Sequence, residues 1–382
     1  MLSGTSLTMA SSALVGVRLA PDPIFATIPL GLAYLSIMLT MIPASLFMRS
    51  HGRRSGFTLG ACLGLVGGLT SATAIYQQSF SLFCVGSALF GSASGFAHYY
   101  RFAAAELVDE SYRSRAISWV LAGGLVAAFV GPGTAQLTRE LIPDALFSAS
   151  YAAVALFCLG TVIAQYFIRI PRPPREETGG ERRPLSRVLS QPGFLVALIC
   201  AMIAYGTMNL LMTATPLAMH HRQMPFGDTA VVIQWHIVGM FAPSFFTGSL
   251  IHRFGVLKIM FCGALALLAC AAIALEGQQY WHFFVGLLLL GAGWNFLYIG
   301  STTLLTGVYL PAEKAAVQGI NEFLVFGATA ATALSSGYLH HTLGWERLNL
   351  YTIPVTAFAA VIIVMLGWRA RRQTLTAPGP GG

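Results

Sequence analysis

Charged residues are scarce in this sequence of 382 amino acids. Asp, Glu, Lys and Arg together make up 9% of it, hydrophobic residues make up 55%, and the mean hydropathy is +0.69. A soluble protein of this length would not reach these values. The scarcity of charge therefore excludes a soluble domain and indicates a membrane protein that crosses the bilayer many times, with about 20 apolar residues for each helical crossing.

Cysteine motifs and catalytic groupings are also missing. The six cysteines lie inside apolar runs and none forms a CxxC pair, which excludes a disulfide framework and a zinc site. There is no carboxylate pair, nucleophile with a base, or phosphate-binding loop, so we expect no enzyme and no cofactor. The net charge is +8, but the basic residues are spread over many loops instead of one patch, which excludes nucleic acid as a partner.

Long apolar runs fill most of the chain and predict an all-α membrane protein with twelve transmembrane helices. The predicted spans are 2–19, 22–47, 56–76, 80–105, 116–137, 146–168, 193–218, 229–251, 257–275, 281–308, 315–338 and 348–368. The first span begins at the initiator Met and is rich in Ser and Thr, so either its hydroxyls line a pore or the true start lies upstream. A second apolar stretch follows directly, so no cleavable leader is expected.

Lys and Arg are concentrated on alternate loops. One side has them at 49–54, 113–115, 169–187, 253–258, 314 and 369–372, whereas the other side has only Arg18, Arg139, Arg222 and Arg347. By the positive-inside rule, both termini are expected in the cytoplasm. The stretch 169–192 is rich in Pro, Gly and charge and predicts a cytoplasmic linker between two halves.

The two halves are predicted to be a six-helix unit at 1–168 and a second at 193–370, followed by a cytoplasmic tail at 371–382. Similar loops follow the second span of each half. Gly52 lies in the first loop, RSHGRR, and Gly255 lies in the second, HRFG.

In its topology and in these two loops, the chain resembles the major facilitator superfamily. That family carries a G-x-L-a-D-R-x-G-R-R signature between the second and third spans of each half. Gly248, Leu250 and Arg253 match the second copy, whereas Arg49 and His252 replace its acidic residue in the two copies. The resemblance implies the twelve-helix fold of this superfamily.

Two pairs of soft-metal ligands lie in spans seven and eight: Met208 with Met212, and His236 with Met240. A spacing of four places both members of a pair on one helix face. If the two spans are antiparallel neighbours, all four side chains converge near the bilayer midplane, where transporter sites lie. Thioethers with one imidazole suit Cu(I). The alternative is that these methionines only fill gaps in packing.

At these pairs the chain resembles the CcoA-type copper importers, bacterial transporters that supply copper for assembly of heme-copper cytochrome c oxidases. Their signature is MxxxM in span seven and HxxxM in span eight. The segments YGTMNLLMTATPLAMHHR at 205–222 and YYRFAAAE at 99–106 are similar as well. The resemblance implies that the four side chains bind copper as a transported substrate, with copper chaperones as partners, in the bacterial cytoplasmic membrane. We expect a monomer.

A second group of soft or imidazole ligands follows span seven: Met219, His220, His221 and Met224. These side chains are predicted to bind copper first, near the periplasmic mouth. The alternative is a wet loop whose histidines bind nothing in particular.

Polar residues inside other spans are further candidates. Glu322 lies about two turns inside span eleven, where an ionisable group is a candidate for proton coupling; the alternative is a contact between helices. Arg101, near the cytoplasmic end of span four, is predicted to act as a gate or an anchor. Asn295 and Tyr298 in span ten are expected either to line the cavity or to pack.

Two other functions fit the same sequence. The first is transport of a small organic molecule, since riboflavin-type transporters resemble this family, and such a substrate needs aromatic groups and hydrogen bonders around the cavity. The second is a membrane sensor or assembly partner that binds copper without moving it. The Met and His pairs favour copper.

The charge bias predicts that residue 180 and the C-terminus both face the cytoplasm. Reporter enzymes fused at these two points, one kind active only in the cytoplasm and the other only in the periplasm, measure this directly. An active periplasmic reporter at either point would contradict the twelve-span topology.

Overall fold

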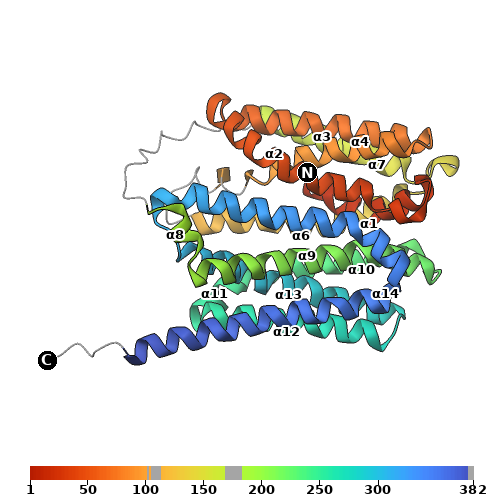
Figure 1. Ribbon diagram of the computed structural model, residues 1–382. Helices are drawn as coiled ribbons and strands as arrows, with labels where there is room; N and C mark the ends of the chain where they lie inside the picture. Colours follow the sequence, from red (N-terminus) through yellow and green to blue (C-terminus); the bar gives the residue numbers. More distant parts are fainter. Residues whose placement is uncertain (101–102, 105–112, 168–182, 377–382) are drawn as a thin grey trace.

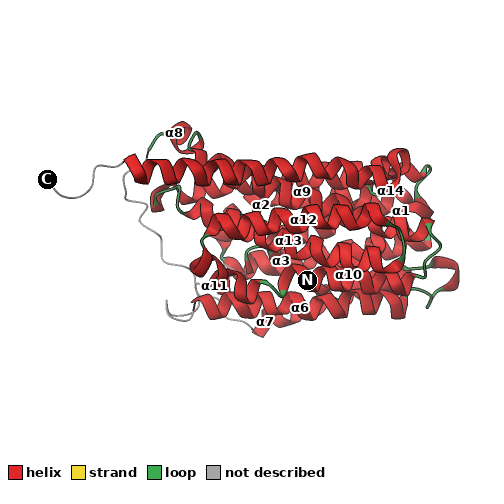
Figure 2. Ribbon diagram, turned by 90° about the horizontal axis from the view of Figure 1, so that it is seen from below, coloured by secondary structure: helices red, strands yellow, loops and turns green. Residues whose placement is uncertain are grey.

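The computed structural model describes residues 1–100, 103–104, 113–167 and 183–376. Every regular element in these ranges is a helix, and the long helices run side by side in one bundle (Figures 1 and 2). The helices of the first half are α1 (Leu2–Leu19), η1 (Pro23–Phe25), α2 (Ile28–His51), α3 (Arg53–Tyr76), α4 (Phe80–Ala97), α6 (Arg113–Thr138), η3 (Pro143–Ala145) and α7 (Ser148–Phe167). The second half has α8 (Leu185–Leu189), α9 (Pro192–His221), α10 (Phe226–Phe241), α11 (Ser244–Phe254), α12 (Val256–Glu276), α13 (Tyr280–Thr306), η4 (Pro311–Glu313) and α14 (Lys314–Thr376).

Most of the described helices are long enough and apolar enough to cross a bilayer. Eight helices meet this requirement, and the bent pair of α10 and α11 makes a ninth. α14 counts once among the eight, although Gly344, with φ of 75°, divides it into two segments. The twelve predicted spans correspond to these helices together with α1, α6 and the second segment of α14. The predicted span 229–251 is interrupted, because the helix bends by 40° next to Pro243.

The hydroxyl groups of α1 face the protein interior. Ser6, Thr8, Ser11 and Ser12 are buried, and the Ser11 hydroxyl donates a hydrogen bond to the Leu7 carbonyl of the previous turn. Such bonds satisfy a hydroxyl inside a helix bundle without water. Thr8 and Ser12 also border a void of about 10 Å³, which has room for about one water molecule.

The two halves repeat the same helix packing. α3 packs on α4 and α7, α2 packs on α4, and α1 packs on α6. After the linker, α12 packs on α13 and α14, α10 packs on α13, and α9 packs on α14. Gly52 and Gly255, which the sequence repeat aligns, have nearly equal φ angles of 88° and 91°. Only glycine adopts this conformation without strain, so both helix-to-helix corners depend on it.

The halves meet along three helix pairs: α2 with α14, α6 with α10, and α1 with α9. α9 lies at the centre of the bundle and buries most of its length (Figure 1). The backbone N–H of Gly337 in α14 donates a hydrogen bond of 2.9 Å to the Thr27 hydroxyl at the start of α2. The boundaries of the two halves and of the tail stay predictions, because parts of the linker and of the C-terminal end lie outside the described residues.

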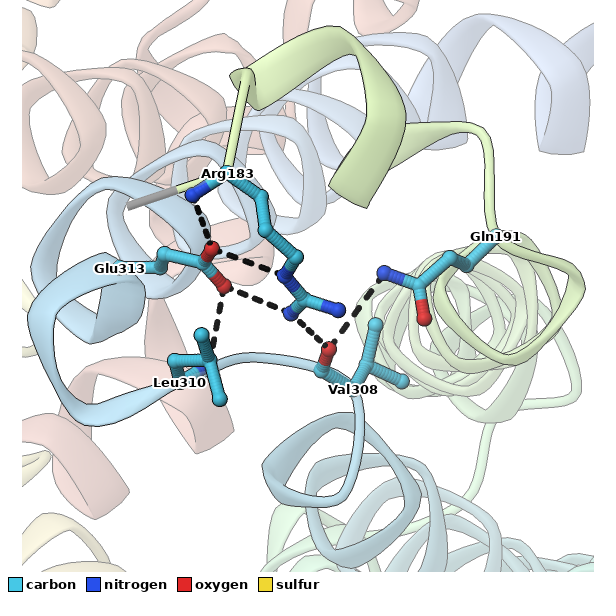
Figure 3. Close-up of polar contacts among 5 residues, drawn as sticks. All are labelled: Arg183, Gln191, Val308, Leu310 and Glu313. Atoms are coloured by element: carbon cyan, nitrogen blue, oxygen red, sulfur yellow. Dashed lines mark hydrogen bonds and ion pairs between the residues drawn. The ribbon is translucent and has the colours of Figure 1, made fainter. Parts of the chain in front are cut away.

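An ion pair with a buried carboxylate fixes the chain where the linker ends (Figure 3). Arg183 donates to both carboxylate oxygens of Glu313, from Nε at 2.9 Å and from Nη2 at 2.7 Å, and its backbone N–H donates at 2.8 Å. Arg183 Nη2 also donates to the Val308 carbonyl at 2.8 Å, and the Leu310 N–H donates to Glu313 at 2.9 Å. The chain just before α8 is thereby tied to the segment between α13 and α14. We call this end of the bundle the linker end.

The Arg183 guanidinium and the two backbone N–H donors lower the pKa of Glu313 to about 2, from an ordinary value of 4.5. Because the carboxyl pKa is lower in the folded protein than in the unfolded chain, the ion pair stabilises the fold at pH values above 4.5. This stabilisation is lost as the pH falls toward the folded pKa of about 2. The pair therefore stays ionised throughout the physiological pH range and cannot act as a pH switch there.

Close packing of α4 on α2 depends on Gly91, because a side-chain carbon there would collide with the backbone of Ala33. We expect Gly91→Ala to lower the thermal unfolding temperature of the purified protein, with a cost of about 1–3 kcal/mol for overpacking. Gly160→Ala on α7 is the matched control, because no described atom lies within 4 Å of that position. The control should be as stable as the parent or slightly more stable. Equal unfolding temperatures for both variants would contradict this packing.

Candidate functional site

The four predicted copper ligands are all buried, and the three methionines among them belong to one hydrophobic cluster. Met208 and Met212 lie on α9, and His236 and Met240 lie on α10. However, α9 packs mainly against α14 and α13, whereas α10 packs mainly against α13 and α6. The expected convergence of the four side chains depends on close packing of spans seven and eight against each other. In the structure, both helices pack instead on α13. Copper binding by the four side chains stays a prediction.

His236 is the most unusual of these residues. Its Nδ1 lies 2.8 Å from the Leu287 carbonyl of α13 and must donate to it, because a carbonyl only accepts. Neutral imidazole carries one proton, so Nε2 presents a lone pair. This nitrogen is fully buried and has no hydrogen-bond partner among the described residues. An unsatisfied buried polar atom costs about 1–3 kcal/mol, so Nε2 is available to a ligand or a metal.

The predicted outer copper site is brought together in part. His220, His221 and Met224 border a cavity of about 650 Å³ at the end of the bundle opposite the linker end. Met219 does not line this cavity, because its side chain is completely buried in the hydrophobic cluster around α9, against which Met224 also packs. Within the described ranges, no three His, Cys, Asp or Glu side chains lie close enough together to hold a metal ion.

Of the two predicted coupling or gating residues, one can be located. Glu322 lies on α14, is half-buried, and accepts a hydrogen bond of 3.3 Å from the Tyr298 hydroxyl of α13. Arg101 lies outside the described residues, so its predicted role stays a prediction.

Asn295 is fully buried and hydrogen-bonded through both atoms of its amide. Its amide nitrogen donates to the Met240 carbonyl and to the Ser244 hydroxyl, both at 2.6 Å, and its oxygen accepts from the Thr247 hydroxyl at 2.7 Å. These groups lie at the bend between α10 and α11, where Pro243 cannot supply a backbone donor. Asn295 therefore supplies hydrogen-bond partners to polar groups at the bend between α10 and α11, and its role is structural.

An aromatic cluster that the sequence did not reveal surrounds Tyr298. The Trp294 and Tyr298 rings of α13 stack at 5.3 Å with an angle of 17°, and Tyr205 of α9 meets them edge-on at 5.1 and 4.7 Å. Phe326 of α14 lies 5.7 Å from Tyr205 and 5.0 Å from His98 of the first half. We call these five residues the aromatic cluster. The spacing of four between Trp294 and Tyr298 was the available signal in the sequence.

Buried polar atoms without partners lie on the helices that carry this cluster. Asn209 donates to the Thr329 carbonyl of α14 at 3.0 Å, but its oxygen has no partner within the described part of the chain. The same holds for the Thr213 hydroxyl and for the indole nitrogen of Trp294. Tyr205, Asn209 and Thr213 follow each other at spacings of four on one face of α9. α9 and α13 therefore combine aromatic surface with unused hydrogen-bonding groups.

The profile of the family described as the Major Facilitator Superfamily matches residues 1–243 and 197–381. The chain is 38% identical over 368 residues to the riboflavin transporter RfnT of Brucella anthropi, covering 95% of this chain and 92% of that protein. It is also 26% identical over 380 residues to the uncharacterized MFS-type transporter YdeG of Bacillus subtilis, covering 94% of this chain and 88% of that protein.

Solved structures share the fold at low sequence identity. The xylose transporter XylE from E. coli, in a partially occluded inward open conformation, matches with a TM-score of 0.69 at 12% identity, covering 100% of this chain and 97% of that one. A D-xylose-proton symporter matches with a TM-score of 0.72 at 14% identity, covering 95% of this chain and 94% of that one. The resemblance to the superfamily is thus confirmed. None of these relatives supports the narrower resemblance to copper importers, and the riboflavin transporter favours the organic-substrate alternative.

Proposed function

Because the chain belongs to the major facilitator superfamily, and is therefore a membrane transporter and not an enzyme, we propose that it carries a planar aromatic molecule of the riboflavin class. The observation that carries this proposal is the aromatic cluster, in which four rings of the second half meet His98 of the first half. The 38% identity to a riboflavin transporter, over nearly the whole length of both chains, supports the same substrate class.

A planar heterocycle gains affinity by stacking on aromatic side chains, at about 1–3 kcal/mol for each ring. The rings of the aromatic cluster now pack against one another. A substrate ring replaces one of these contacts when the halves move apart. The unused atoms Asn209 Oδ1 and Trp294 Nε1 then supply an acceptor and a donor for the polar edge of the heterocycle.

Alternating access follows from the position of the cluster between the halves. Phe326 lies on α14, which forms with α2 one of the three helix pairs that join the halves. Its ring partner His98 comes directly after α4 in the first half. Rocking of one half against the other separates these two rings while each half keeps its own packing. The aromatic cluster is therefore opened and closed by the same movement that exposes a site to one side of the membrane and then to the other.

The membrane and the coupling ion complete the proposal. The bacterial relatives favour a location in the cytoplasmic membrane. The bias of Lys and Arg toward alternate loops favours termini in the cytoplasm. In this proposal the protein acts as a monomer. Glu322 couples transport to protons, because its carboxylate is hydrogen-bonded to Tyr298 of the aromatic cluster. Substrate stacked on Tyr298 alters this hydrogen bond and hence the affinity of Glu322 for a proton.

A second candidate function is import of Cu(I) for cytochrome c oxidase assembly, with copper chaperones as partners. The specific observation in its favour is the buried Nε2 of His236, which has no partner among the described residues and lies on the same helix as Met240. A neutral imidazole with three thioethers is a suitable donor set for Cu(I).

Uptake of radiolabelled riboflavin and of copper by cells, normalised to the amount of protein in the membrane, separates the two functions. We expect Trp294→Leu to raise the riboflavin concentration needed for half-maximal uptake about tenfold, the equivalent of about 1.4 kcal/mol of lost stacking. Trp281→Leu, a change at an exposed Trp of the same helix, is the matched control and should have little effect.

Met208→Leu nearly preserves side-chain volume and should leave riboflavin uptake within about twofold of the parent. If copper is the substrate instead, the outcomes reverse: Met208→Leu abolishes copper uptake, Trp294→Leu preserves it, and no variant takes up riboflavin. That pattern would replace the first function with the second.

Glu322→Gln keeps the shape of the side chain and removes its charge. We expect the accelerating effect of an inward proton gradient on riboflavin uptake to disappear, while exchange of riboflavin across the membrane without a gradient continues. The measurement is uptake into vesicles containing the purified protein, at fixed internal pH and varied external pH. An unchanged pH profile in this variant would leave helix packing as the only role of Glu322.

A further inference from the structure

The cavity of about 650 Å³ lies at the end of the bundle opposite the linker end, away from the aromatic cluster, and both halves contribute to it. The first half supplies the end of α1 and the loop between α6 and α7, and the second half supplies the turn between α9 and α10. These turns lie at the opposite end of the bundle from α8 (Figure 1). The volume falls within the range of about 300–1,000 Å³ that is usual for small-molecule sites.

The charged side chains that line this cavity are all basic. Arg18 of α1 is exposed there and has no hydrogen bond or ion pair among the described residues. Arg139 is held in place, because its guanidinium lies 5.6 Å from the Phe147 ring and 5.3 Å from the Phe226 ring. His220 and His221, at the end of α9, also line the cavity.

Acidic groups do not cancel this charge. None of the described residues that line the cavity is Asp or Glu. Glu140 contacts Arg139 at 3.5 Å, but its side chain is 72% exposed, so water screens this ion pair strongly. Asp228 lies in the first turn of α10 and interacts electrostatically with Tyr280 of α13. Two guanidinium groups, one from α1 and one from the loop after α6, therefore face a polar cavity with little compensating negative charge.

Aromatic rings also border the cavity. Phe147 belongs to the first half and Phe226 to the second, and their rings meet edge-on at 5.1 Å beneath the Arg139 guanidinium. This arrangement fixes the orientation of one cation and leaves Arg18 free to reach an anion. Guanidinium groups bind phosphate and carboxylate through paired, charge-assisted hydrogen bonds.

We propose that this cavity is a second binding site, in which Arg18 and Arg139 hold the phosphate of an organic anion whose aromatic body lies against the lining. The proposal rests on the proposed function in taking the aromatic body from the same substrate class. Because both halves line the cavity, a ligand bound there bridges them at the side that the charge bias predicts to be extracytoplasmic. A phosphorylated flavin therefore binds here without needing the aromatic cluster.

The test uses the full-length protein purified in detergent and measures the rise in unfolding temperature with flavin mononucleotide, riboflavin or inorganic phosphate. We expect Arg18→Gln to weaken binding of flavin mononucleotide about fivefold and Arg18→Glu to weaken it further, with riboflavin binding unchanged in both. Arg347→Gln is the matched control, since Arg347 is an exposed arginine outside the cavity lining. Added salt should weaken binding of the mononucleotide and not of riboflavin.

Unchanged binding of flavin mononucleotide in both Arg18 variants would overturn the proposal, and so would an equal loss in Arg347→Gln. Stabilisation by phosphatidylglycerol in nanodiscs that depends on Arg18, without any effect of the mononucleotide, would assign the cavity to a lipid headgroup and overturn it as well. Arg18-dependent binding of the mononucleotide, in a protein that takes up no riboflavin, would support this site and reject the proposed function. The two failures are thus distinguishable.

Discussion

A polar group inside a membrane bundle has to find its partner within the protein, because lipid offers none. Asn295 meets this requirement completely: its amide satisfies three groups at the bend between α10 and α11. Trp294, its neighbour in the sequence, does not, because its indole nitrogen is buried without a partner among the described residues. The contrast separates residues that maintain the fold from residues that are available to a ligand.

The same constraint organises the halves. Within each half, glycines allow helix backbones to approach closely, as Gly91 does against Ala33, and this packing holds a half together as a unit. Between the halves the contacts include ring pairs such as His98 with Phe326 and Phe147 with Phe226. Ring faces separate and rejoin without leaving buried backbone groups unpaired. The ring pairs between the halves are therefore contacts that a rocking movement can break and remake.

Much of the fold could be predicted from the sequence, because span length, loop charge and the Gly52 and Gly255 repeat are local signals. The site could be predicted only in part. Met208 and His236 lie on consecutive spans, and sequence order suggested direct contact, whereas the structure packs both helices on α13. The aromatic cluster joins residues from three helices of the second half and one from the first, and no local spacing encodes such a meeting. For this reason, the place of Tyr205 in the aromatic cluster could not be predicted from the sequence.

Stacking of the aromatic cluster on a planar substrate is measured directly by flavin fluorescence. Stacking on Trp and Tyr quenches flavin emission. Titration of riboflavin with the purified full-length protein should therefore quench its emission to saturation. In Trp294→Leu, the protein concentration needed for half-maximal quenching should rise about tenfold, whereas in Trp281→Leu it should stay unchanged. Emission that is unaffected by the parent protein, or quenched equally by both variants, would contradict the account.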